Sequence, residues 1–295
     1  MSRGTTTRET ASAVTTLDLS DRPAAYPMLV DRPASPAALA AGDLGHGFAR
    51  WWLWGLVAWW DIKQRYRGSV LGPLWLTLST AVMVASLGAL YSRLFHMDLA
   101  TYLPYLSLGL LGWGLISALL TEACTAFIAA EHVIKQIRMP LSVHLYRVIA
   151  RNLIVFGHNL LVFVVVAVWF RVPVGWADLM VLPGIALLIL TTVPTGLLLA
   201  ALCARFRDIP PVVASLLQVV FFLTPIMWRP ELLGSNLALA RYNPVNCFLD
   251  LMRAPLLGEW IPPSSWAVAA GVTGLAWLLA FPFFARFRAR IAYWV

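Results

Sequence analysis

The stretch DIKQRYRGSVLGPLW, residues 61–75, sets a cluster of charges directly before a long apolar run. Lys63, Arg65 and Arg67 lie in it, and a Gly-Pro pair marks the boundary with the apolar residues. Basic side chains beside a hydrophobic segment hold that end of the segment on the cytoplasmic side of a membrane. Proline suits the first turn of a helix, where its missing N–H group needs no partner. The stretch therefore predicts where a first transmembrane helix begins and on which side of the membrane.

The composition indicates a membrane protein over most of the chain. Its 295 residues are 60% hydrophobic and 12% charged, whereas a soluble domain carries about 25% charged residues. Six segments are long enough to cross about 30 Å of hydrocarbon, and backbone groups in lipid must bond within their own segment. We therefore predict an all-α membrane protein with six transmembrane helices, over residues 73–95, 102–130, 148–170, 176–203, 211–228 and 266–285.

The orientation of these spans follows from the cations near their ends, because cytoplasmic connections are rich in Lys and Arg. One set of connections holds Arg50, Lys63, Arg65, Arg67, Lys135, Arg138, Arg147, Arg151, Arg205, Arg207, Arg286, Arg288 and Arg290. The other set holds Arg93, Arg171, Arg229, Arg241 and Arg253. The first set is thus predicted to face the cytoplasm, together with both termini.

Two regions precede the first span. Residues 1–47 are rich in Ser, Thr, Ala and Pro and lack the apolar run of a signal peptide, which predicts a disordered cytoplasmic tail. Residues 48–295 are then the transmembrane domain. Residues 48–67 are too mixed to span, and their tryptophans predict an amphipathic helix in the cytoplasmic interface. Within it, Asp61 and Arg65 are one helical turn apart, a spacing at which they can pair.

The connection over residues 131–147 is basic yet partly apolar. It predicts a short amphipathic helix under the membrane, which Pro140 bends or breaks. Such a helix either anchors the chain or contacts a partner, and the residues alone leave both alternatives open.

The connection over residues 229–265 is long and, for a loop, apolar. Asn243 as N-cap and Pro244 in the first turn predict a helix there. Its apolar stripe consists of Phe248, Leu251 and Met252. We expect re-entrant or surface helices on the outer face, before the last span.

The chain lacks the usual motifs of enzymes. It has no Walker-type phosphate loop, no zinc-binding His-Glu helix and no Gly-x-Ser-x-Gly elbow. We therefore predict no catalytic residue, no metal site and no nucleic acid as a partner. Glu122 is the one acid in the middle of a predicted span, which marks either a functional group or a carboxyl that is protonated or paired with Asn152 or His158.

Four blocks of the sequence resemble the transmembrane subunit of polysaccharide ABC exporters, which carry lipid-linked O-antigen, capsule, teichoic acid or galactan. They are WDIKQRYRGSVLGPLW at residues 60–75, EHVIKQIRMP at 131–140, FRDIPPVVASLLQVVFFLTPIMW at 206–228 and YNPVNCFLDLMRAPLLG at 242–258. The resemblance covers residues 48–295 and departs at Trp60, where the family pattern has Arg. It implies the ABC exporter permease fold.

The resemblance also implies partners and a location. Two copies of this chain would form a homodimer in the bacterial inner (plasma) membrane, with two separate nucleotide-binding subunits below it. ATP and Mg²⁺ would bind to those subunits, and this chain would hold no cofactor. Coupling to the ATPase is implied for the segment that contains Glu131, Ile134, Lys135, Arg138, Met139 and Pro140.

The implied substrate is a glycan on undecaprenyl diphosphate. Its anionic diphosphate would be bound at a cytoplasmic gate by charge-assisted hydrogen bonds, with Lys63, Arg65, Tyr66 and Arg67 as candidates. The alternative for the same residues is plain anchoring to lipid headgroups.

Aromatic faces stack on sugars without fixing one register. The candidates for lining the channel are Trp75, Tyr91, Phe95, Phe221, Phe222 and Trp228. On a straight helix Trp75 and Tyr91 are about 160° out of phase, so they cannot both face a pore. Two other functions stay open: export of small molecules or lipo-oligosaccharides by the same superfamily, and a membrane enzyme that acts on the same lipid.

Overall fold

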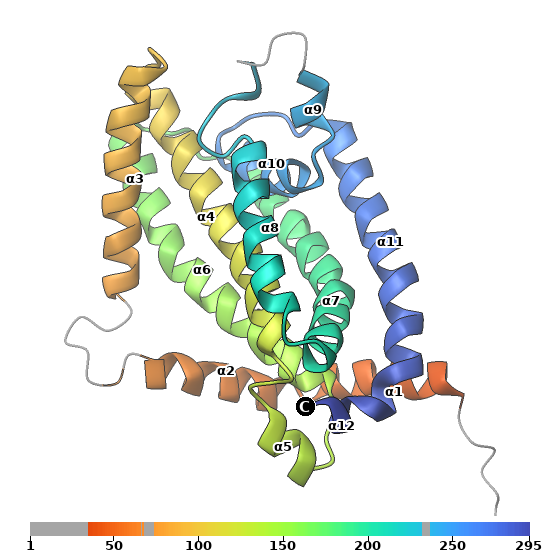
Figure 1. Cartoon of the computed structure of the whole chain (residues 1–295). Coiled ribbons are helices and arrows are strands. Elements are labelled where there is room, and N and C mark those ends of the chain that lie inside the picture. Colours follow the sequence, from red (N-terminus) through yellow and green to blue (C-terminus); the bar gives the residue numbers. More distant parts are fainter. Residues whose placement is uncertain (1–34, 66, 68–73, 232–236) are drawn as a thin grey trace, which may run out of the picture. The chain divides into compact units, whose positions relative to one another are not determined.

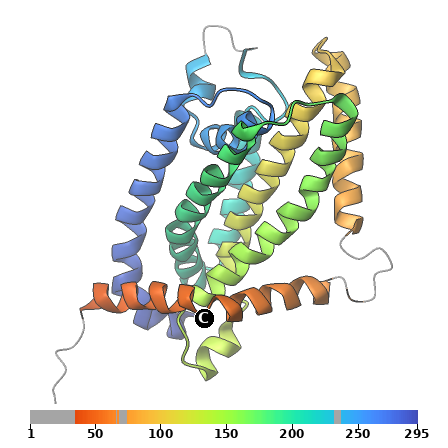
Figure 2. The same cartoon turned by 180° about the vertical axis from the view of Figure 1, so that it is seen from behind.

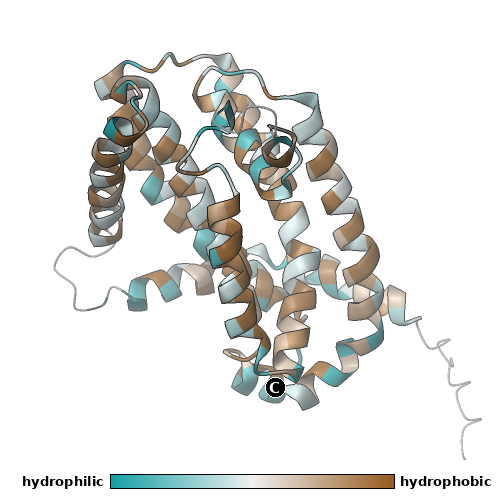
Figure 3. Ribbon diagram, turned by 45° about the horizontal axis from the view of Figure 1, so that its top comes forward, coloured by the Kyte–Doolittle hydropathy of each residue, from teal (hydrophilic) through white to brown (hydrophobic). Residues whose placement is uncertain are grey.

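The computed structural model describes residues 35–65, 67, 74–231 and 237–295, and all of these belong to one compact unit. Within these ranges the regular secondary structure is entirely helical. Long helices run side by side, and shorter helices gather at the two ends of the bundle (Figure 1 and Figure 2). Hydrophobic residues dominate the long helices (Figure 3). The all-α prediction is thus confirmed for the described residues.

Among the described residues, five helices are long and apolar enough to cross a membrane. They are α3 (Leu74–Leu94), α4 (Leu99–Thr125), α6 (Ser142–Phe170), α7 (Val181–Arg205) with the preceding 3-10 helix η2 (Trp176–Met180), and α11 (Pro263–Phe287). They correspond to five of the six predicted spans.

The predicted fifth span appears as a shorter helix, α8 (Ile209–Leu223), which has 15 residues. At the α-helical rise, 15 residues extend about 22 Å, less than the hydrocarbon core of about 30 Å. Thr224 leaves the helix with extended backbone angles, because the residue before a proline, here Pro225, is kept out of the helical region. The predicted C-terminal end of this span, at residue 228, is therefore wrong, because the helix ends at Leu223.

Two helices cross one end of the bundle at a steep angle to the long helices: α1 (Pro36–Ala49) and α2 (Trp51–Arg65) (Figure 1). Helix α2 confirms the helix predicted before the first span, and its exposed residues include Trp51, Trp52, Trp59 and Trp60. Helix α1 contradicts the predicted disorder for residues 36–47. It forms because Ser35 caps it by accepting the Ala38 N–H, with proline in its first turn. Residues 1–34 of the predicted tail lie outside the described residues.

The short helices divide between the two ends of the bundle (Figure 1 and Figure 2). Helix α5 (Glu131–Gln136), η4 (Arg288–Arg290) and α12 (Ile291–Trp294) lie at the same end as α1 and α2. Helices α9 (Leu237–Arg241) and α10 (Pro244–Leu256) lie at the opposite end. Because the long helices alternate in direction, the two sets of cations lie at opposite ends, as predicted.

Helix α4 is the centre of the bundle. Its most apolar stretch is 72% buried, against 11% for α3 and 17% for α6. The other helices approach one another closely at glycines: a Cβ on Gly184 of α7 would lie 2.7 Å from the carbonyl oxygen of Leu251 in α10. Such packing seats α10 between the outer halves of the long helices.

One buried carboxylate fixes where α6 begins. Asp43 of α1 accepts the N–H groups of Leu141 and Ser142 at 3.1 and 3.0 Å, and Arg288 of η4 donates to it at 2.8 Å. Free N–H groups and the positive helix terminus both favour an anion at this position. Helix α6 therefore starts at Ser142, and the predicted connection over residues 131–147 is shorter than expected.

Helix α10 begins as its sequence predicts. Asn243 accepts the N–H groups of Val245 and Asn246, and Pro244 occupies the first turn. The predicted stripe of Phe248, Leu251 and Met252 is buried. Most of α10 is buried within the chain, and the choice between a re-entrant and a surface helix stays a prediction.

Candidate functional site

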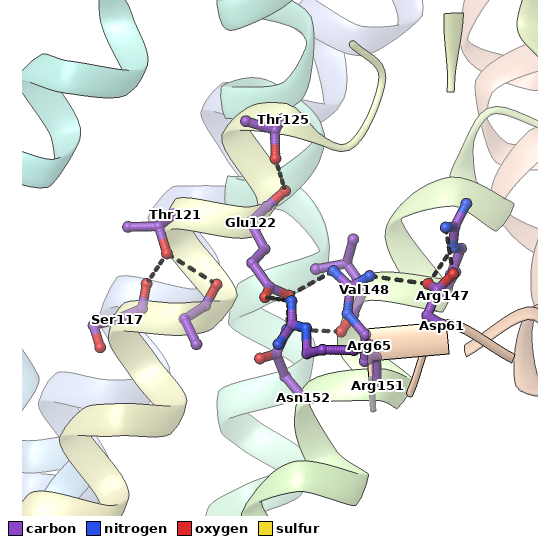
Figure 4. Close-up of polar contacts among 11 residues, drawn as sticks. Asp61, Arg65, Ser117, Thr121, Glu122, Thr125, Arg147, Val148, Arg151 and Asn152 are labelled. Carbon is purple, nitrogen blue, oxygen red and sulfur yellow. Dashed lines mark hydrogen bonds and ion pairs between the residues drawn. The ribbon is translucent and has the colours of Figure 1, made fainter. Parts of the chain in front are cut away.

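An ion-pair network joins α2, α4 and α6 at the end of the bundle that carries α1 (Figure 4). Asp61 of α2 accepts two hydrogen bonds from Arg147, each of 2.6 Å, and one of 2.9 Å from Arg151. Arg151 also donates to Glu122 of α4 at 2.7 Å. The two arginines are four residues apart on α6, so they lie on one face of that helix. The network holds the transverse helix α2 against the long helices.

Glu122 lies in the last turn of α4 and not in mid-span, because α4 ends at Thr125. Its Oε2 accepts from Arg151 and, at 2.5 Å, from Asn152. Pairing with Asn152, one of the predicted alternatives, is therefore confirmed. The alternative partner His158 instead places its Nδ1 3.2 Å from a carbonyl oxygen of its own helix.

The predicted pair between Asp61 and Arg65 is wrong. Asp61 faces α6, where two arginines surround it, and Arg65 donates instead to Glu122 Oε1 at 3.5 Å. Sequence reasoning missed this arrangement because, for Asp61, it weighed only a partner on the same helix. The i, i+4 spacing of Arg147 and Arg151 was the available signal, since it places two cations on one face of the next span.

The predicted gate residues lie at the end of α2. Lys63 is exposed, with its Nζ 5.2 Å from the centre of the Trp60 ring. Arg65 is 53% exposed and Arg67 is also exposed. Tyr66 and residues 68–73, including the Gly-Pro boundary, lie outside the described residues. The three described cations are thus all exposed near the end of α2, and of these Arg65 contacts the ion-pair network.

The predicted coupling segment contains the short helix α5. Lys135 donates to Glu131 at 2.6 Å, and this hydrogen bond holds the pKa of the Glu131 carboxyl below its usual value. Ile134 packs against the core, whereas Val133 and Ile137 on the same segment are exposed. The helix is amphipathic, as predicted, and offers apolar side chains to solvent.

A groove of about 850 Å³ lies beside this segment. One wall is α1, the second is the coupling segment and the third is the η4–α12 end of the chain. The coupling segment contributes Ile134, Ile137, Arg138, Met139, Pro140 and Leu141 to its lining. Four of the six predicted coupling residues therefore line one groove.

The predicted channel aromatics form separate groups in this single chain. Tyr91 of α3 stacks on Phe95, just past the end of that helix, with ring centres 5.5 Å apart, and Phe221 contacts Phe222 on α8 with ring centres 5.3 Å apart. Trp75 is exposed at the start of α3. The Trp228 indole N–H donates to the Phe222 carbonyl at 3.4 Å. The aromatic pair of Tyr91 and Phe95 and the aromatic pair of Phe221 and Phe222 make no ring contact with each other in this structure.

A groove of about 440 Å³ between α4 and α8 combines aromatic and polar side chains. Its lining includes Trp113, Ser117, Thr121, Gln218, Phe221 and Phe222. Trp113 packs on Phe221 with ring centres 5.5 Å apart, and the predictions had missed it. Its signal was the column of Trp113, Ser117 and Thr121 at intervals of four residues along α4.

At the opposite end, the segment after α8 is tied down by side chains of α4 and α10. Tyr105 donates to the carbonyl of Pro225 at 2.9 Å, and Arg253 donates to the same carbonyl at 3.1 Å. Arg253 pairs with Asp250 at 2.7 Å, and burial raises the pKa of Asp250 against the opposing effect of this arginine. These contacts satisfy backbone groups that the early end of α8 leaves without helical partners.

In the described ranges, no group of three His, Cys, Asp or Glu side chains lies close enough together to hold a metal ion.

Comparison with known proteins gives the chain its family. The family described as ABC-2 type transporter matches residues 53–257. The chain is 26% identical over 193 residues to the O-antigen export system permease protein RfbA of Myxococcus xanthus, covering 65% of this chain and 74% of that relative. It is 25% identical over 191 residues to the protein of the same name from Klebsiella pneumoniae, covering 63% and 72%. Since the family match covers more than half of the chain, this protein is a multi-pass membrane transport subunit of the ABC-2 type transporter family.

Proposed function

We propose that this chain is the membrane-spanning subunit of an ATP-driven exporter that moves a lipid-linked O-antigen type of glycan out of the cytoplasm. The similarity to O-antigen export permeases carries the proposal, and it extends over most of those relatives. Such a lipid carries a diphosphate, and the exposed cations Lys63, Arg65 and Arg67 near the end of α2 offer the matching positive charge. Guanidinium groups bind phosphate oxygens through paired, charge-assisted hydrogen bonds.

The groove between α4 and α8 suits the attached sugars. Thr121, which lines it, directly precedes Glu122 of the ion-pair network in the chain, so the groove and the network reach the same level of α4. Hydroxyl and amide groups hydrogen-bond sugar hydroxyls, and the faces of Trp113 and Phe221 offer apolar contact to sugar C–H groups. A glycan held by its diphosphate near Arg65 would therefore enter a lining that matches its chemistry.

A second copy of the chain fits the exposed side of α8. No residue of α8 is buried in the single chain, and Val212, Leu216, Val219 and Phe222 are exposed. A short helix in contact with lipid leaves part of the hydrocarbon thickness uncovered. Pairing of two copies along α3 and α8 would cover these faces and turn the open groove into a closed path.

The ATPase would be a separate chain that binds at the end carrying α5. Positive charge gathers at this end, which supports its placement on the cytoplasmic side of a bacterial inner membrane. The exposed apolar side chains of Val133 on α5 and Ile137 just after it, with Arg138 beside them, offer a surface for such a subunit. ATP and Mg²⁺ would bind to that partner.

Charge reversal tests the diphosphate role. The double variant Arg65→Glu and Arg67→Glu, expressed with its ATPase in cells that make the glycan, is expected to lose surface glycan on gels while keeping normal membrane abundance on immunoblots. Arg241→Glu, an exposed cation at the opposite end, is the matched control and should export normally. Normal export by the double variant at normal abundance would contradict the role.

A second experiment tests the coupling segment. Ile137→Asp is expected to reduce co-purification of the ATPase, because it places a charge on an exposed apolar residue of the segment. Val174→Asp, at a more exposed apolar residue between α6 and η2, is the control. Full recovery of the ATPase with Ile137→Asp would exclude this side chain from the contact.

A further inference from the structure

We propose that Glu122 is a positioning residue that holds Arg65 and gives it up to a phosphate group of a lipid. The inference rests on the proposed function, and it assigns a role to the one acid near the membrane boundary of α4. Figure 4 shows the carboxylate together with its three partners Arg65, Arg151 and Asn152.

The two oxygens of Glu122 are bound unequally. Oε2 accepts short hydrogen bonds of 2.7 and 2.5 Å from Arg151 and Asn152. Oε1 lies 3.5 Å from Arg65, at the limit of a hydrogen bond. The carboxylate is therefore fixed from one side, whichever way Arg65 turns.

Exposure singles out Arg65 as the group that can exchange. Its side chain is 53% exposed, whereas that of Arg151 is 16% exposed. Exposed ion pairs contribute little to stability, while a guanidinium binds phosphate through two parallel hydrogen bonds. A phosphate group at the headgroup level can thus displace Glu122 from Arg65 but cannot reach Arg151 as easily.

The net charge of the network also favours the release of Arg65. The network contains the carboxylates of Asp61 and Glu122 and the cations Arg65, Arg147 and Arg151, so it carries one positive charge in excess. When Arg65 leaves, two carboxylates and two guanidinium groups remain, and their formal charges cancel. Departure of Arg65 therefore leaves no unpaired charge behind, and it delivers one cation to the ligand.

The test measures binding of two phosphate lipids to the purified full chain with its ATPase, by native mass spectrometry. The probes are undecaprenyl diphosphate and phosphatidylglycerol, each added to detergent-solubilised protein. Glu122→Gln is expected to tighten binding up to about fivefold, the range set by loss of one exposed ion pair. The double variant Glu122→Gln with Arg65→Ala should bind no more tightly than Arg65→Ala alone. Glu259→Gln, an exposed acid on the outer connection, is the control.

Asn152→Ala gives an independent change of opposite sign. It removes one hydrogen bond from Oε2 of Glu122, so the carboxylate holds Arg65 more firmly and phosphate binding should weaken. A purely structural role of the network would weaken binding in Asn152→Ala and Glu122→Gln alike.

The outcomes separate cleanly. Tighter binding of undecaprenyl diphosphate alone supports the exchange with the substrate as ligand. Tighter binding of both lipids supports the exchange with any lipid phosphate. Unchanged or weaker binding by Glu122→Gln overturns the role of Glu122 and leaves the proposed function standing. If the wild type binds neither lipid, both the inference and the proposed substrate are overturned.

Discussion

Each end of the bundle holds an arginine beside a carboxylate, but in different surroundings. At the α10 end, Arg253 is 4% exposed, pairs with Asp250 and binds the Pro225 carbonyl. At the α2 end, Arg65 is half exposed and makes one long contact with Glu122. The arginine of the first pair is buried and makes several hydrogen bonds, whereas that of the second pair is exposed to solvent and makes one long contact. Burial thus separates an arginine that maintains the fold from one that is free to bind a ligand.

The strongest test of this comparison is Arg253→Ala. It leaves Asp250 without its cation in a buried site, and loss of one partner of a buried pair costs about 3–5 kcal/mol. We expect a large drop in the thermal unfolding temperature of the detergent-solubilised protein. Arg241→Ala, at an exposed arginine that donates to Ser264 at 3.3 Å, is the control. Equal unfolding temperatures for the two variants would contradict the structural role of Arg253.

The substitution Gly184→Ala tests the close packing of α10 against α7. The new Cβ would meet the carbonyl oxygen of Leu251, which is backbone and cannot turn away, so overpacking is expected to cost about 1–3 kcal/mol. Gly114→Ala is the matched control, because a Cβ on Gly114 meets nothing within 4 Å. Thermal unfolding measures both, and a stabilised Gly184→Ala would show that α10 packs less closely than described.

At the other end, Asp43→Asn tests the cap of α6. The amide keeps one acceptor oxygen but loses the charge that binds Arg288, at a cost of about 1–2 kcal/mol. We expect faster hydrogen exchange in α1 and in the first turn of α6, measured by mass spectrometry. Asp98→Asn, at the N-cap of α4 where the side chain makes no capping hydrogen bond, should leave exchange unchanged.

The smallest expected effect is that of Arg65→Ala. Because the pair with Glu122 is long and exposed, its loss should lower the free energy of unfolding by less than about 1 kcal/mol. The unfolding temperature should stay near that of the wild type, in contrast to Arg253→Ala. A large destabilisation would show that Arg65 maintains the fold and would remove the contrast between the two ends.

The sequence predicted those features that depend on local patterns. Long apolar runs located five spanning helices, and the Asn243-Pro244 pair located the start of α10. The arrangement of cations along the chain separated the two ends of the bundle. The resemblance in four blocks named the family that the comparison later confirmed.

Apart from the pairing of Glu122 with Asn152, contacts between distant segments were not predicted. Asp43 lies in a stretch whose composition suggests disorder, yet its carboxylate caps a helix that begins 99 residues later. Asp61 has a cation at the ideal spacing on its own helix, and two arginines of α6 compete successfully for it. The spacing of residues within one helix does not show which side chains of other helices lie near Asp61, and those side chains decide its ion pairs.

The Asp43 carboxylate also bears on where this protein can be shortened. The family match begins at residue 53, so a gene trimmed to that boundary would encode every residue recognised as ABC-2 and lack α1. The first amide groups of α6 would then face water in place of their cap, and Arg288 would lose its counter-ion. Residues before the recognisable domain thus help to hold the segment that we assign to the ATPase, and expression of the protein should begin upstream of them.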